Sequence, residues 1–70
     1  MKSFFKDTKK TIGVGDQVIF HNYMNRIIDG IIYKITPDNT ALQIGSRIFW
    51  FANRDMEVFL NKRDTKIVKR

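Results

Sequence analysis

Short segments rich in β-branched and aromatic residues, each bounded by turn-forming residues, run through the middle of this chain. The strongest spans residues 26–35 and is dominated by isoleucine. Such residues pack well on a pleated surface. Glycine, proline, asparagine and aspartate separate the segments, and these residues favour turns. The pattern predicts an all-β fold of short strands.

Five strands are expected, and their ranges follow from alternation and from the turns between them. Gly45 and Ser46 predict a two-residue hairpin turn, and Gly30 predicts a bulge or a sharp bend within the second strand. A short 3₁₀ turn is expected at residues 52–55. The predicted strands are residues 17–21, 26–35, 40–44, 47–51 and 56–60.

The length and the charge pattern set the organisation of the chain. Seventy residues without a cysteine predict a single domain, 1–70, whose core must stabilise it without disulfides. The net charge of +6 is divided into +3 in residues 1–12, −1 in residues 13–60 and +4 in residues 61–70. We therefore expect a barrel over about 11–60 with flexible basic ends, 1–10 and 61–70. Alternatively, residues 66–69 add an edge strand.

A resemblance to a known fold follows from the glycines and aliphatic residues of these strands. The run Gly15-Asp16-Gln17-Val18, with Gly30 and later Gly45 among aliphatic residues, resembles the KOW-type motif of SH3-like barrels. The resemblance covers about residues 13–60 and implies a five-stranded SH3-like barrel. It also implies nucleic-acid binding, because KOW-type domains are RNA-binding modules.

Catalytic constellations are not evident in the sequence. His21 is the only histidine, the acidic residues show no paired spacing, and no set of metal ligands can be identified. The opening is similar to that of the type II dihydrofolate reductases, but residues 48–51 lack the glutamine of their Val-Gln-Ile-Tyr motif. We predict that the protein is not an enzyme and uses no cofactor or metal.

The hairpin turn fixes which side chains share a sheet face. A two-residue turn places Leu42 opposite Phe49 and Ala41 opposite Trp50, and opposed residues lie on one face. Leu42, Ile44, Phe49 and Phe51 form the better core, so Trp50 is expected on the outer face. Extending the register places further residues beside it. The expected patch comprises Ile32, Lys34, Gln43, Ile48 and Trp50.

Two functions remain open for such a patch. The first is non-catalytic, backbone-directed binding of RNA or DNA with low sequence specificity, in which the basic ends hold phosphates. The second is protein interaction, either with a host protein, as for a small phage or mobile-element factor, or with a second copy as a homodimer. The predicted binding residues are Tyr23, Arg26, Lys34, Gln43, Ile48, Trp50, Lys62, Arg63 and Lys66.

Two further expectations concern location and the first residues. No apolar run is long enough to span a bilayer, so no membrane partner and a cytoplasmic location are expected. Phe4 and Phe5 are too apolar for a purely disordered arm, and Trp50 can alternatively lie beneath them.

Overall fold

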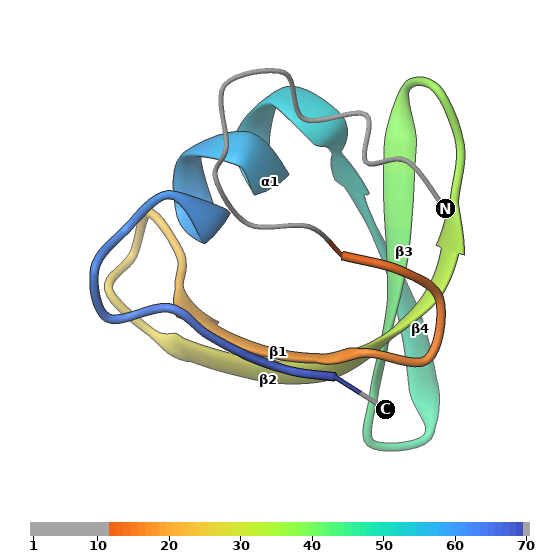
Figure 1. Ribbon diagram of the computed structural model, residues 1–70, viewed down its shortest axis with the longest axis horizontal. Helices are drawn as coiled ribbons and strands as arrows, with labels where there is room; N and C mark the ends of the chain where they lie inside the picture. Colours follow the sequence, from red (N-terminus) through yellow and green to blue (C-terminus); the bar gives the residue numbers. More distant parts are fainter. Residues whose placement is uncertain (1–11, 70) are drawn as a thin grey trace.

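One curved antiparallel sheet and one helix make up the fold (Figure 1). The computed structural model describes residues 12–69, so residues 1–11, including Phe4 and Phe5, lie outside the described part. The sheet order is β4-β3-β2-β1-β5. The elements are β1 (Gln17–His21), β2 (Ile27–Ile35), β3 (Asn39–Ile44), β4 (Arg47–Ala52), α1 (Asn53–Leu60) and β5 (Lys66–Val68).

The core lies between the concave side of the sheet and α1. In Figure 1 strands β1, β2 and β5 run along the bottom, β3 and β4 rise at the right, and α1 lies above β1 and β2. Phe20 of β1 stacks on Phe59 of α1, with ring centroids 5.0 Å apart. Strands β4 and β5 are the two edges, and within residues 12–69 they are not paired with each other. The buried core comprises Ile12, Val18, Phe20, Ile32, Leu42, Met56, Phe59 and Leu60.

The hairpin of β3 and β4 has the predicted turn and register. Ile44 pairs with Arg47, and the ladder continues through Leu42–Phe49 and Ala41–Trp50. Gly45 has φ of +63°, while Ser46 does not have a positive φ. This is the type II′ geometry, which needs glycine at the first central position and matches the twist of the strands. The hairpin prediction is therefore confirmed.

The bulge lies at Tyr33 rather than at Gly30. The register of β2 against β3 shifts between Ile32 and Lys34, so Tyr33 is the extra residue. Ile32 then shares the inner face with Leu42 and is fully buried, and its expected place in the outer patch was wrong. Gly30 is in regular register, and a Cβ there would lie 3.0 Å from the Ile44 Cγ1 atom. Its role is close approach to β3.

The segment predicted as the fifth strand is a helix. Met56, Phe59 and Leu60 are buried at spacings of three and four residues, which is the period of an α-helix. Val58, which alternation would bury, is 46% exposed. The expected 3₁₀ turn at 52–55 is likewise replaced, because α1 begins at Asn53. The fold is mostly β rather than all-β.

The fifth strand comes instead from the C-terminal segment. β5 pairs antiparallel with β1, with Ile67 opposite Val18. Ile67 packs against the core, and the Thr65 hydroxyl donates a hydrogen bond to the Phe59 carbonyl oxygen at 2.5 Å. The Lys69 ammonium lies 2.7 Å from the buried Asp16 carboxylate. Residues 65–69 are therefore part of the folded domain. The alternative of an edge strand in this segment is confirmed, and the prediction of a flexible end is wrong for these residues.

Candidate functional site

The outer face of β2, β3 and β4 carries the aromatic part of the candidate site. Ala41 of β3 lies between Trp50 on one side and Lys34 on the other, so the three form one row across the sheet. Trp50 is 55% exposed, and its outward orientation agrees with the prediction. Ala41 is fully buried, so the accessible surface belongs to the larger side chains around it.

The bulge adds Tyr33 to this face. The extra residue sits beside Lys34, where the ladder is interrupted, and its side chain is 55% exposed. Sequence reasoning missed it, because regular alternation from Ile35 does not place Tyr33 and Lys34 together on the surface. Bulges re-aim side chains and often occur beside binding sites. Trp50, Lys34 and Tyr33 are called the aromatic platform below.

A second row on the same face is more apolar. Ile48 pairs with Gln43, Gln43 with Ile31, Ile31 with Gln17, and Gln17 with Val68, which links all five strands. Ile48, Ile31 and Val68 are each exposed. Ile48 and Gln43 were predicted here, whereas Ile31 was missed because the bulge brings it, not Ile32, to the outer face.

Two of the predicted residues lie in the loop between β1 and β2, which α1 supports. Asn22 orders the loop, since its side-chain oxygen accepts hydrogen bonds from the backbone N–H groups of Met24 and Arg26. The Tyr23 ring packs edge-on against Phe59, and its hydroxyl donates to the Asp55 carboxylate at 3.1 Å. Desolvation of that hydroxyl, followed by the Asp55 hydrogen bond and charge, raises the pKa of Tyr23.

The segment after α1 carries the remaining predicted cations. The Lys62 ammonium donates to the His21 carbonyl oxygen at 3.4 Å and lies 5.9 Å from the centre of the Phe59 ring. Arg63 is exposed. Lys66, on β5, pairs with Ile19 of β1 and faces the outer side.

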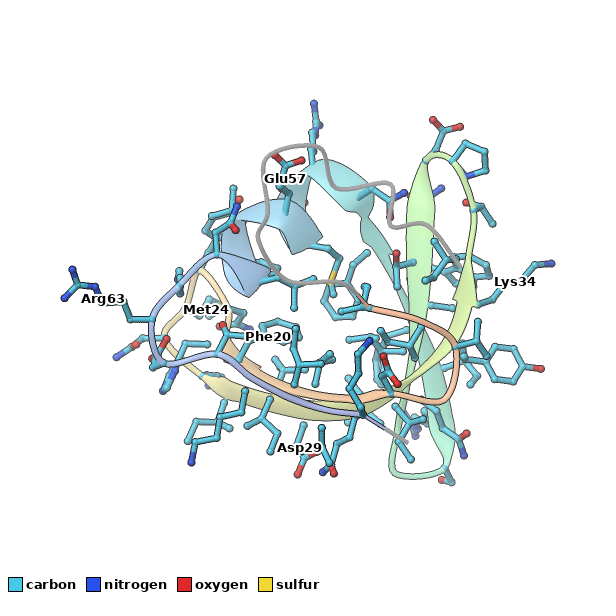
Figure 2. All side chains as sticks on the ribbon, viewed as in Figure 1. Phe20, Met24, Asp29, Lys34, Glu57 and Arg63 are labelled. Carbon is cyan, nitrogen blue, oxygen red and sulfur yellow. The ribbon has the colours of Figure 1, made fainter. Side chains whose placement is uncertain are left out.

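The nine predicted residues therefore fall into separate groups. Figure 2 shows Lys34 at one side of the molecule and Arg63, with Met24 of the β1–β2 loop, at the opposite side. The aromatic platform, the Ile48 row and Lys66 lie on the sheet, whereas Tyr23 and Arg26 lie in the β1–β2 loop and Lys62 and Arg63 follow α1. A ligand would have to be extended to reach both groups.

Polar pairs elsewhere hold the fold together. The His21 Nδ1 atom lies 2.6 Å from an Asp64 carboxylate oxygen and so joins β1 to the segment before β5. The Asn53 side chain accepts from the Thr40 hydroxyl at 2.6 Å and donates to the Thr36 carbonyl oxygen, which fixes the start of α1. Among residues 12–69 no three histidine or carboxylate side chains gather as metal ligands would.

Comparison with known proteins gave no relative. No family model, no curated protein and no solved structure matches the chain. In the described part of the chain, no helix has the length and apolar character needed to cross a bilayer.

Proposed function

We propose that this chain is a non-catalytic module that binds single-stranded nucleic acid on the aromatic platform. The observation that carries the proposal is the alignment of Trp50 and Lys34 across β3, with Tyr33 beside Lys34 at the bulge. Both aromatic rings are more than half exposed on one sheet face. An exposed aromatic pair with a lysine beside it offers what an unstacked base and its phosphate need.

The physical basis is stacking combined with charge. Every base has a π-face, so stacking on a tryptophan or tyrosine contributes about 1–3 kcal/mol per base with little sequence preference. Lysine contacts the phosphates without reading sequence. The net charge of +6 attracts a polyanion over a longer range. Bases within a duplex are already stacked, so single strands are the preferred ligand.

The proposed fold for this module is an SH3-like small barrel. Its support is the strongly curved antiparallel sheet, the nine-residue β2, and the KOW-type run of glycine and aliphatic residues that opens β1. In this proposal β1 to β4 form the barrel wall and α1 covers its open side.

The test is a binding titration with labelled oligonucleotides. Mixed-sequence single-stranded DNA, single-stranded RNA and duplex DNA are titrated with the protein and followed by fluorescence anisotropy. Single strands should bind more tightly than duplex, and log K should fall with log salt by about 0.7 per phosphate contacted. Trp50→Ala and Tyr33→Ala should each weaken binding by roughly 5- to 150-fold, from about 1–3 kcal/mol of stacking.

Tyr23→Ala is the matched control, because Tyr23 is equally an exposed tyrosine but lies at the other side of the molecule. It should leave the affinity for single strands within about twofold. Absence of binding at low salt, or an affinity independent of salt, would reject nucleic acid as the ligand. Equal losses from Tyr23→Ala and Tyr33→Ala would reject the platform as its site.

A second candidate function is recognition of a protein partner. Its support is the apolar row of Ile48, Ile31 and Val68, together with the separation of the cations into distant groups. Exposed apolar side chains gathered on one face are typical of protein-binding surfaces, and in this row Gln43 and Gln17 lie between the three. This function is favoured if oligonucleotides do not bind.

A further inference from the structure

Strand β4 has one open edge. It pairs with β3 on one side, and no strand of residues 12–69 pairs with its other side. The Ile44–Arg47 pair closes the two-residue turn and is a hydrogen-bonded pair. Hydrogen-bonded and non-hydrogen-bonded pairs alternate along an antiparallel ladder, so Arg47, Phe49 and Phe51 bond to β3. The backbone N–H and C=O groups of Ile48, Trp50 and Ala52 therefore point to the open side.

The two edges of the sheet differ in their protection. β5 is three residues long, begins with Lys66 and is followed by Lys69, and short lysine-bearing edges resist pairing with other chains. β4 is six residues long, contains no proline or lysine, and carries a single charge, Arg47, at its beginning. An edge of this kind is a template for another strand.

Side chains on both faces of β4 are incompletely covered. Ile48 and Trp50 face outward, and Phe49 faces the core side with Leu42, yet Phe49 is 42% exposed. A ligand lying on the outer face alone cannot cover Phe49. A strand added beside β4 covers all three residues at once, because its side chains alternate between the same two faces.

We propose that the occupant of this edge is β4 of a second copy of the chain, paired antiparallel about a two-fold axis at Phe49. Each Ile48 then lies opposite Trp50 of the other copy, and the two Phe49 side chains meet on the inner face. The backbone N–H and C=O groups of Ile48 and Trp50 point to the open side, so in this register Ile48 of each copy can exchange hydrogen bonds with Trp50 of the other copy. This proposal does not rest on the nucleic-acid proposal, although Trp50 belongs to both surfaces and a dimer paired here would cover it.

The charges on β4 suit the antiparallel arrangement. Arg47 takes a place opposite Phe51, so the two Arg47 side chains lie at opposite ends of the joined strands. A parallel arrangement would place them side by side, and opposed like charges are destabilising. Because each copy carries +6, salt screens the repulsion between copies and should strengthen the dimer.

The area indicates a reversible dimer. Aromatic side chains bury about 150–250 Å² each when fully covered, so the exposed parts of Trp50 and Phe49 supply roughly 200 Å² per copy. Ile48 and the strand backbone add to this. The total stays below about 1,200 Å² over both partners, the lower end of specific interfaces, so the dimer is weak. Association should therefore depend on protein concentration.

Sedimentation equilibrium over a wide range of protein concentrations tests the proposal. The average mass should rise from 8.3 kDa toward twice that value, and more readily at high salt. Ile48→Lys places a charge on the open edge and should keep the protein monomeric. Val68→Lys is the matched control, since Val68 lies in the same cross-sheet row at the other edge and is similarly exposed. It should dimerise as the wild type does.

Disulfide trapping tests the register without relying on the stability of those variants. The chain has no cysteine, so Phe49→Cys carries one thiol on the proposed two-fold axis. Directly opposed residues without backbone hydrogen bonds lie about 4.5 Å apart at Cα, within reach of a disulfide. Mild oxidation should yield a covalent dimer at least tenfold faster than for Val68→Cys.

Three results would overturn the proposal. These are a wild-type protein that stays monomeric at every concentration and salt, equal dimerisation by wild type and Ile48→Lys, and equal rates of disulfide formation by the two cysteine variants. All of these variants keep Trp50 and Tyr33. Failure to dimerise would therefore reject the dimer without rejecting nucleic-acid binding, which the oligonucleotide titration tests separately.

Discussion

Phe49 and Trp50 are neighbours in β4 that face opposite sides of the sheet, yet both are substantially exposed. The reason is position rather than orientation. An edge strand has a neighbour on one side only, so even its inward side chains are covered from one direction. Burial of a residue therefore depends on the place of its strand in the sheet as well as on the face it occupies.

Three alanine substitutions separate these effects. Phe20→Ala removes a fully buried ring that stacks on Phe59 and should cost about 3–5 kcal/mol. Phe49→Ala should cost about half as much, because the ring is only partly covered, and Trp50→Ala should cost less than about 1 kcal/mol. Denaturant midpoints at low protein concentration give the values. A cost for Trp50→Ala equal to that for Phe20→Ala would contradict the outward orientation.

The pKa of Tyr23 can be read directly, because the chain has only two tyrosines. In a Tyr33→Phe background, alkaline absorbance titration should give a pKa above the ordinary 10.0, and adding Asp55→Asn should lower it toward that value. The folded state keeps the proton longer than the unfolded state does. The contribution to stability is therefore complete below pH 10.0 and is lost as the pH rises through the raised pKa. Identical titrations with and without Asp55→Asn would exclude the carboxylate as a cause.

At the scale of elements, β5 and α1 depend on each other. Thr65 bonds to the last turn of α1, and Ile67 continues the core beside Val18. Ile67 and Val68 are adjacent but lie on opposite faces, so they form an internal comparison. Residues 65–69, called the brace, thus connect α1 through Thr65 to the sheet through Ile67.

Removing residues 65–70 should consequently unfold the domain or lower its stability by several kcal/mol. Burial of one aliphatic side chain contributes about 1.5–3 kcal/mol and a hydrogen bond about 0.5–1.5 kcal/mol, against a total stability of about 5 kcal/mol for a domain this small. Ile67→Ala should cost clearly more than Val68→Ala. Thermal unfolding followed by circular dichroism checks both. A truncated protein with an unchanged melting temperature would show that the brace is dispensable.

Local signals predicted the hairpin correctly and failed at α1 for a physical reason. A glycine followed by a serine between two apolar runs is compatible with few turn types. The turn therefore predicted the register of β3 against β4. In residues 56–60, Met56 and Leu60 fit both a strand alternation and a helix, and only Val58 and Phe59 distinguish the two. Which of them is buried depends on packing against Phe20, which is remote in sequence.

At the scale of the whole molecule, the candidate site could be predicted only in part. Trp50, Ile48, Gln43 and Lys34 were predicted together because one hairpin and one turn relate them. Tyr33 was missed because a bulge leaves no distinct residue pattern in this strand. The distance of Arg63 from Lys34 was not predictable, since it depends on how far the sheet curves (Figure 2).

The pairing of β1 with both β2 and β5 also bears on how the protein folds. β1 to β4 are joined by short turns, so their contacts form with little loss of chain entropy, whereas β5 must return from the far end of the described chain. Leu42→Ala should therefore slow folding, while Ile67→Ala should mainly accelerate unfolding. Stopped-flow chevron plots distinguish the two, and a slower folding limb for Ile67→Ala would place β5 in the nucleus. If the folding limb is unchanged, β5 is the last strand to dock and the first to open. The rate at which β5 detaches then determines the lifetime of the native state.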